Sequence, residues 1–128
     1  MKFKGRLAYF AHSMRKYNSK EELEQLGYLR SAFQGTVICP NNNLGEFGDM
    51  QPYLDVVSKM DVLFVAEYFD WIGSGVRKEI KEARKYKIPI YVIRKENDQY
   101  VLKKLKRVKP LKPLSKPSAF SANIEVYT

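Results

Sequence analysis

An apolar run followed by a glycine loop and a helical pattern constrains the fold of this chain most. Residues 61–66 read Asp-Val-Leu-Phe-Val-Ala, and residues 73–80 read Gly-Ser-Gly-Val-Arg-Lys-Glu-Ile. Continuous apolar runs are typical of strands buried on both faces of a sheet. A glycine loop that opens a helix leaves backbone N–H groups pointing at the mouth of that sheet. We therefore expect a β–loop–α unit whose loop suits an anion or a sugar hydroxyl.

Glu79 falls in what the pattern predicts to be the first turn of that helix. A carboxylate near a helix N-terminus gains from the macrodipole and tends to remain ionised, which suits it to attack an electron-poor carbon. The alternative is that Glu79 only completes the first turn of the helix. The motif alone leaves both interpretations open.

Apolar segments alternate with helical patterns along the rest of the chain. Ser19 and Glu22 form a capping box at the start of the first helix, and Gly35 is predicted to end it. The predicted strands are 7–11, 36–39, 61–66 and 88–93, and the predicted helices are about 19–34, a short helix from Pro52, and about 74–86. This alternation predicts a single-domain α/β fold, three-layer and Rossmann-like or flavodoxin-like, with a mainly parallel sheet of about five strands.

The chain divides by composition into an α/β core, residues 1–95, and a basic C-terminal extension, residues 96–128. The extension either belongs to the same domain or docks on a second subunit. Its segments 100–102 and 124–127 are each candidates for a further strand.

Three polar loops follow the predicted strands of the core. They begin at His12, Pro40 and Glu67, and the carboxyl ends of parallel strands meet at one edge of a sheet, so the loops should converge on one crevice. Residues 41–49, rich in asparagine and glycine, suit either a lid over that crevice or a plain surface loop.

The composition is that of an ordinary globular protein, with 45% apolar and 29% charged residues. Its apolar runs reach about six to eight residues, below the roughly 18 that span a bilayer, so we expect no membrane contact. The N-terminal residues run into a strand pattern rather than a signal peptide, which predicts a cytoplasmic location.

One cysteine and one histidine argue against a metal site. Cys39 is the only cysteine, which excludes an internal disulfide and a cysteine metal cluster. We expect neither a metal nor another cofactor. A cysteine at the end of an apolar strand is usually a small buried hydrophobe.

The net charge of +9 lies mostly late in the chain, where lysines and arginines between residues 94 and 116 mix with Pro110 and Pro113 and are followed by Pro117. That mixture is typical of a solvated, partly extended tail or edge strand. A basic surface attracts phosphorylated small molecules as readily as nucleic acid. Charge alone does not choose between these partners.

Three segments resemble one enzyme family. They are residues 9–15 (Tyr-Phe-Ala-His-Ser-Met-Arg), 61–67 (Asp-Val-Leu-Phe-Val-Ala-Glu) and 75–79 (Gly-Val-Arg-Lys-Glu). Together they resemble the nucleoside 2-deoxyribosyltransferase-like superfamily, and most closely its 2'-deoxynucleoside 5'-monophosphate N-glycosidase branch. The resemblance covers about residues 6–94.

The resemblance implies a reaction for Glu79. In that family the matching glutamate attacks the anomeric carbon, expels the base and forms a glycosyl-enzyme ester, which water or a second base resolves. A carboxylate suits this chemistry because cleavage of an N-glycosidic bond passes through an oxocarbenium-like state.

The resemblance also implies a substrate and binding residues. Ser13, Arg15 and Ser74 would hold the 5'-phosphate of a deoxyribonucleoside monophosphate, and Tyr9 would line the sugar or base pocket. Enzymes of this family commonly dimerise, so a homodimer is expected. The alternative for Ser13 and Arg15 is an ordinary turn with one solvated cation.

The chain departs from the family pattern at its second carboxylate. Tyr53 stands where an aspartate usually faces the sugar, and Asp49 and Asp55 are out of register. Glu67, at a strand end, is a hypothetical substitute for that aspartate. If no second carboxylate reaches the crevice, the site is predicted to bind a nucleotide without cleaving it.

Two loops also depart from the pattern. His12 replaces a small residue of the first loop, where it would narrow the pocket or add a titratable donor, although a lone histidine is more often incidental. In the glycine loop, Gly73 takes the place of the family's serine, so that Ser74, before Gly75, is one position out.

Asp70 and Trp71 precede the glycine loop. A base would stack on the indole or hydrogen-bond to the carboxylate; alternatively the two residues cap or anchor the loop.

The sequence therefore predicts a protein that binds a nucleoside or nucleotide and cleaves or transfers its N-glycosidic bond. Two alternatives remain open. The first is a non-catalytic nucleotide-binding protein that senses or sequesters its ligand, and the second is a nucleic-acid-binding accessory protein that uses the basic tail.

Overall fold

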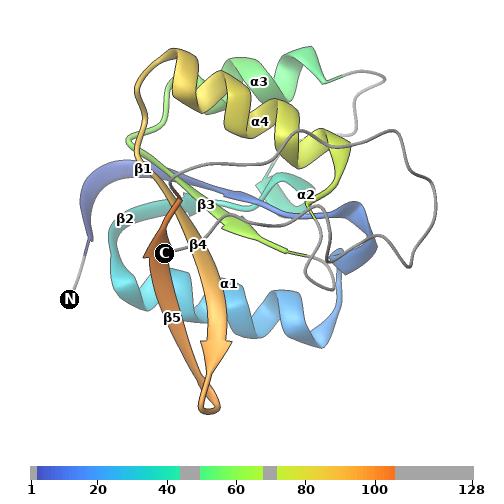
Figure 1. Ribbon diagram of the computed structural model, residues 1–128, viewed down its shortest axis with the longest axis vertical. Helices are drawn as coiled ribbons and strands as arrows, with labels where there is room; N and C mark the ends of the chain where they lie inside the picture. The colour runs from blue at the N-terminus through green and yellow to red at the C-terminus, as the bar shows by residue number, and fades with distance from the viewer. Residues whose placement is uncertain (1–2, 44–49, 68–71, 106–128) are drawn as a thin grey trace.

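The computed structural model describes residues 3–43, 50–67 and 72–105 of the chain (Figure 1). Its helices are a 3₁₀ helix (Met14–Lys16), α1 (Lys20–Ala32), α2 (Pro40–Asn43), α3 (Gln51–Val57) and α4 (Ser74–Lys85). Its strands are β1 (Phe3–Ala11), β2 (Phe33–Ile38), β3 (Val62–Ala66), β4 (Ile90–Glu96) and β5 (Gln99–Lys104).

The strands of the described residues form one sheet in the order β2-β1-β3-β4-β5. The pairs β1–β2, β1–β3 and β3–β4 are parallel, whereas β5 runs antiparallel to β4. Asn97 and Asp98 join β4 to β5 with φ of 51° and 63°, and positive φ at both central residues is typical of a type I′ hairpin turn. The expected α/β fold with a mainly parallel sheet is confirmed.

Helices lie on both faces of this sheet, as Figure 1 shows. On one face Leu26 and Leu29 of α1 pack in a buried cluster with Ala8 and Phe10 of β1. On the other face, residues of α3 and α4 share a second buried cluster with Tyr9 and Ala11 of β1 and with alternate residues of β3 and β4. Alternate side chains of β1 therefore belong to different cores, as the two-residue period of a strand requires.

β3 is the strand that the sequence indicates most directly. All five of its residues are buried, as predicted for an apolar run covered on both faces. The residue before it, Asp61, is exposed and accepts hydrogen bonds from the backbone N–H groups of Arg6 (2.6 Å) and Leu7 (3.0 Å). These bonds attach the start of β3 to β1.

The predicted end of the first helix was wrong. We expected the helix to run to about residue 34 and stop at Gly35, but α1 ends at Ala32, and Gly35 lies inside β2. Phe33, which matches the helical spacing, instead starts β2 and packs edge-on against Phe64, with ring centroids 5.9 Å apart. Burial against the sheet thus outweighed the local helical pattern.

Several other expectations have a clear outcome. The short helix from Pro52, the helix from Ser74 and the strand at residues 100–102 are confirmed by α3, α4 and β5. Since β5 pairs with β4, the sheet extends past residue 95 into the predicted C-terminal extension. The candidate strand 124–127 and most of the basic tail lie outside the described residues.

Two further observations concern the loop at residues 41–49 and the membrane. Residues 40–43 form the short helix α2, whereas residues 44–49, the rest of that loop, lie outside the described part. Among the described residues, no helix is long and apolar enough to cross a membrane.

Gly35 and Gly27 test the packing of β2 with a matched pair of substitutions. A Cβ atom at Gly35 would lie 2.6 Å from the carbonyl oxygen of Gly5, whereas one at Gly27, on the exposed side of α1, would meet nothing within 4 Å. We expect Gly35→Ala to lower the free energy of unfolding by about 2 kcal/mol and Gly27→Ala to raise it by up to about 1 kcal/mol. Urea denaturation of both variants measures this, and equal effects would contradict the close approach of β2 to β1.

Candidate functional site

A cavity opens where the strand order of the sheet reverses. From β1 the chain moves to β2 on one side, whereas β3 lies on the other, and ligands of open α/β sheets bind at such a switch point. The cavity has a volume of about 450 Å³. It is lined by residues that follow β1, by Pro40 after β2, and by the start of α4.

The cavity brings together most of the residues that the sequence analysis selected. Those that line it are Tyr9, His12, Ser13, Arg15, Gly73, Ser74, Gly75 and Glu79. Glu67 is not one of them, and Trp71 and Asp70 lie outside the described residues.

Glu79 does not occupy the first helical turn, and this part of the prediction was wrong. α4 begins at Ser74, directly after its N-cap Gly73, so Glu79 lies in the second turn. The stabilising effect of the macrodipole falls off within the first turn. Glu79 is also only 6% exposed, and burial raises the pKa of its carboxyl from an ordinary value of 4.5 to about 7. The carboxyl is therefore divided between its neutral and ionised forms near neutral pH.

Tyr9 faces Glu79 from β1 and is fully buried. The two side chains fall short of full hydrogen-bond geometry, since the Tyr9 hydroxyl has no partner within the described residues. Even so, the hydroxyl lowers the pKa of the Glu79 carboxyl against the larger effect of burial. Burial and the neighbouring carboxylate in turn raise the pKa of Tyr9, which remains a neutral donor at physiological pH.

Ser13 and Arg15 form one wall of the cavity through the 3₁₀ helix that follows β1. The Ser13 Oγ accepts a hydrogen bond from the Arg15 backbone N–H (3.1 Å), which caps this helix. The Arg15 side chain is exposed and lines the cavity, so a permanently charged guanidinium stands at its rim.

The start of α4 forms another wall. Its N-cap Gly73 makes no side-chain cap, and the first N–H groups of a helix have no partner within that helix. A Cβ atom at Gly73 would meet nothing within 4 Å, and one at Gly75 would only touch Met50. The glycines therefore leave the helix N-terminus open to a ligand in the cavity.

Seven lining residues were not selected as substrate contacts from the sequence, and four of them have long side chains from three parts of the chain. Met50 precedes α3, Tyr53 lies in α3, Lys78 lies in α4, and Tyr17 follows the 3₁₀ helix. Burial raises the pKa of Tyr17 to about 12. Only their place in the fold could have revealed them, because aromatic and methionine residues occur at many other positions in the chain.

Tyr53 lines the cavity, and it stands where the enzymes that the sequence resembles have an aspartate. Asp55, the nearby carboxylate, is exposed, accepts a hydrogen bond from the Gln51 side chain (2.7 Å) and does not line the cavity. Among the described residues, Glu79 is the carboxylate that the cavity contains.

Glu67 lies at a second, more open cavity of about 750 Å³. Its Oε1 lies 3.3 Å from the Arg94 Nε and its Oε2 accepts from the Arg94 Nη2 at 3.4 Å. This cavity mixes acidic and basic side chains of α1 and β4. The first cavity is the candidate site because it combines a buried carboxyl, an exposed guanidinium and an open helix N-terminus.

His12 does not present a free ring to the cavity. It is 4% exposed, its Nδ1 lies 2.9 Å from the Phe10 carbonyl oxygen, and its Nε2 lies 2.5 Å from Glu22 Oε2. Burial lowers the pKa of the imidazole. The ring also stacks on Phe10, with centroids 4.1 Å apart. These contacts hold His12 in the wall behind the cavity.

The sequence matches no protein-family model, and no curated protein matches it. The assignment of a class to this site therefore depends on its geometry and on the resemblance described above.

The pKa of Glu79 gives a prediction for stability. Between pH 4.5 and about 7 the folded chain keeps a proton on Glu79 that the unfolded chain has lost, so the free energy of unfolding falls as the pH rises through this window. Glu79→Gln removes the effect, and we expect the variant to gain about 3 kcal/mol relative to the parent between pH 4.5 and 7.

Urea denaturation at a series of pH values measures this difference. Glu82→Gln, one turn further along α4 and partly exposed, is the matched control and should follow the parent. Parallel pH profiles for Glu79→Gln and the parent would show that the carboxyl is not buried as described.

Proposed function

We propose that this chain binds a nucleoside 5'-monophosphate in the cavity beside α4 and cleaves its base–sugar bond through Glu79. The observation that carries the proposal is the buried carboxyl of Glu79 at a cavity of about 450 Å³ that Arg15 also lines. A strongly perturbed acid in a concave site is typical of a catalytic group. The sugar would lie against Glu79, and deoxyribose as the sugar follows from the family resemblance.

The proposed cleavage of the base–sugar bond proceeds in two steps. The ionised Glu79 forms an ester bond to the anomeric carbon as the bond to the base nitrogen breaks, and the electron pair of that bond goes to the base. Water then adds its hydroxyl group to the anomeric carbon and frees Glu79, and the base gains one hydrogen overall. A second base in place of water would make the reaction a transfer.

The neighbours of Glu79 suit this sequence. Tyr9 offers a neutral phenol to the carboxyl, and so favours the ionised form that attacks. Arg15, the Ser13 hydroxyl and the open N-terminus at Ser74 lie on the same cavity, and a phosphate group fits a guanidinium next to helix N–H groups.

A non-catalytic nucleotide-binding protein is the second candidate. Tyr53 favours it, because the tyrosine takes the place of the family's second carboxylate and the described cavity offers no replacement. Such a protein would keep the phosphate contacts and release no base.

The proposal has three further parts. The three-layer Rossmann-like or flavodoxin-like class follows from the alternation of strands and helices, and the helices on both sheet faces support it. A homodimer follows from the resemblance, and the proposed location is the cytoplasm. Nucleic-acid binding through the basic tail is less supported, because most of that tail lies outside the described residues.

Base release tests the catalytic role of Glu79. We expect the parent to release free base from one or more deoxyribonucleoside 5'-monophosphates, with kcat/KM rising with pH up to about 7 and then levelling, because the attacking carboxyl must be ionised. Glu79→Gln should lower the rate at least about 1,000-fold, and Glu82→Gln should leave it unchanged.

Chromatographic assay of the released base over a panel of nucleosides and monophosphates provides the measurement. Calorimetric binding of a monophosphate without any base release would favour the non-catalytic candidate. Neither binding nor release by the folded parent would reject both.

Arg15 tests the phosphate preference. Arg15→Gln should weaken binding of a nucleoside monophosphate at least about tenfold and leave binding of the matching nucleoside unchanged, because the guanidinium contacts only the phosphate in this proposal. Isothermal titration compares the two ligands, with Arg30→Gln, an exposed arginine of α1 outside the cavity, as control. Equal losses for both ligands would place Arg15 elsewhere on the ligand.

A further inference from the structure

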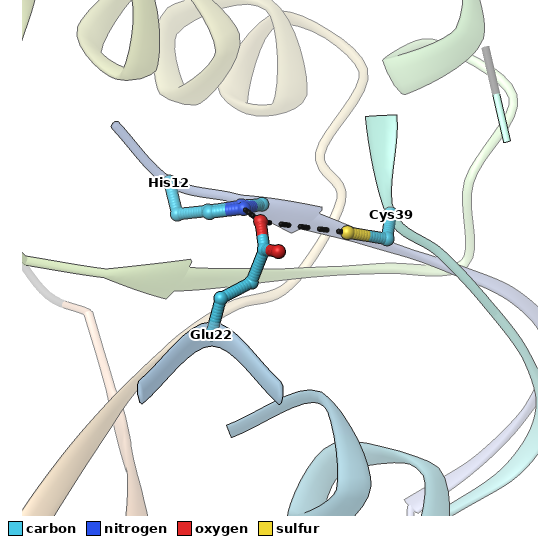
Figure 2. A group of neighbouring side chains, drawn as sticks. All are labelled: His12, Glu22 and Cys39. Atoms are coloured by element: carbon cyan, nitrogen blue, oxygen red, sulfur yellow. Dashed lines mark hydrogen bonds and ion pairs between the residues drawn. The ribbon is translucent and has the colours of Figure 1, made fainter. Parts of the chain in front are cut away.

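Three buried side chains from different elements meet behind the cavity wall. His12 follows β1, Glu22 lies in the first turn of α1, and Cys39 follows β2 (Figure 2). The three are 4%, 1% and 0% exposed, and their ligand atoms all lie within 4.8 Å of one another. Figure 2 shows the imidazole and the thiol both directed at the Glu22 carboxylate.

The hydrogen bonds of His12 leave room for a cation between its Nε2 atom and the Glu22 carboxylate. Its Nδ1 lies 2.9 Å from the Phe10 carbonyl oxygen, which only accepts, so Nδ1 carries the ring proton of the neutral imidazole. The lone pair of Nε2 then faces Glu22 Oε2 at 2.5 Å. Two lone pairs at this distance require a proton or a metal ion between them. A histidine whose other nitrogen donates to a backbone carbonyl is oriented as metal-bound histidines usually are.

We propose that His12, Glu22 and Cys39 bind one divalent cation of the zinc type. Nitrogen, carboxylate oxygen and thiolate sulfur are the ligands that Zn²⁺ takes in proteins. The charges also balance, since an anionic Glu22 and Cys39 with a neutral His12 offset the two charges of the ion. This site is independent of the proposed function. One cysteine and one histidine predicted no metal site, because a count of these two residue types leaves out the carboxylate of Glu22.

The cluster needs only small movements to hold the ion. Tetrahedral ligands of Zn²⁺ lie about 3.3 Å apart for nitrogen and oxygen and about 3.6 Å apart when one of them is sulfur. The His12–Glu22 distance of 2.5 Å would open by about 0.8 Å, and the Cys39–Glu22 distance of 4.0 Å would shorten by about 0.4 Å. The His12 nitrogen and the Cys39 sulfur, which lie within 4.8 Å of each other, would close by up to about 1.2 Å. Rotation about the side-chain torsions moves all three ligand atoms.

Asn41 and the cavity complete the surroundings of the site. The Cys39 thiol donates to the Asn41 Oδ1 at 3.0 Å, which places an amide oxygen within reach of a fourth coordination position. His12, a member of the cluster, and Pro40, which follows Cys39 in the chain, line the cavity, so the cavity offers the ion an entry path.

Metal titration of the full chain tests the proposal directly. After dialysis against a chelator, the parent should bind one Zn²⁺ or Co²⁺ per chain and release two protons at about pH 7, one from the thiol and one from the His12–Glu22 pair. The cobalt form should show a sulfur-to-cobalt charge-transfer band. Absence of saturable binding, or binding without that band, would overturn the proposal from the parent alone.

Substitutions then identify the ligands. Cys39→Ser keeps a hydroxyl to donate to Asn41, and should abolish the charge-transfer band and weaken Zn²⁺ binding at least about 100-fold, more than loss of an outer contact costs. Glu22→Gln should weaken binding similarly, whereas Glu21→Gln, its exposed neighbour paired with Lys16, should bind as the parent does. Unchanged affinity in folded Cys39→Ser would refute the site. These outcomes involve no base release, so they are separate from the fate of the proposed function.

Discussion

The hydrogen bonds of the Glu22 carboxylate hold together the edge of the sheet at which β1 and β2 end. Its Oε1 accepts from the Asn18 backbone N–H (2.9 Å) and the Asn41 side chain (3.3 Å), and its Oε2 contacts His12 (2.5 Å). These partners come from the segments after β1 and β2, so one buried side chain of α1 fixes both strand exits. A buried carboxylate is tolerated only when such partners surround it, and here they also shape the wall of the cavity.

Burial, rather than the helix dipole, determines the pKa of the Glu79 carboxyl in the candidate site. Glu79 reaches the cavity from the second turn of α4, where the sheet and Tyr9 enclose it and its carboxyl resists ionisation. The positive features, Arg15 and the first N–H groups of α4, lie toward the rim. A ligand whose anionic end occupies the rim would bring its apolar or sugar part against Glu79, so the cavity orders a ligand along its length.

The sequence predicted the elements better than their ends. The strand β3 and the start of α1 could be predicted because their signals are local in the sequence. The apolar run of β3 is buried throughout, and the Ser19 Oγ accepts a hydrogen bond from the Glu22 backbone N–H (3.0 Å). The end of α1 could not be predicted, because Phe33 fits a helical spacing. Its packing against Phe64, which lies far away in the sequence, places it in β2 instead. The burial of Glu79 and the meeting of Glu22 with Cys39 depend on tertiary packing that spacing along the chain cannot show.

The order of strands also bears on how the chain is made. Tyr9 and Ala11 of β1 belong to the core that α3, α4, β3 and β4 complete, and β1 pairs with β3 through partners such as Ala8 and Val62. During vectorial synthesis β1, α1 and β2 leave the ribosome first and can cover only the opposite face of β1. The nascent chain therefore carries an uncovered apolar strand face until about fifty further residues have emerged, the interval in which chaperones bind such segments.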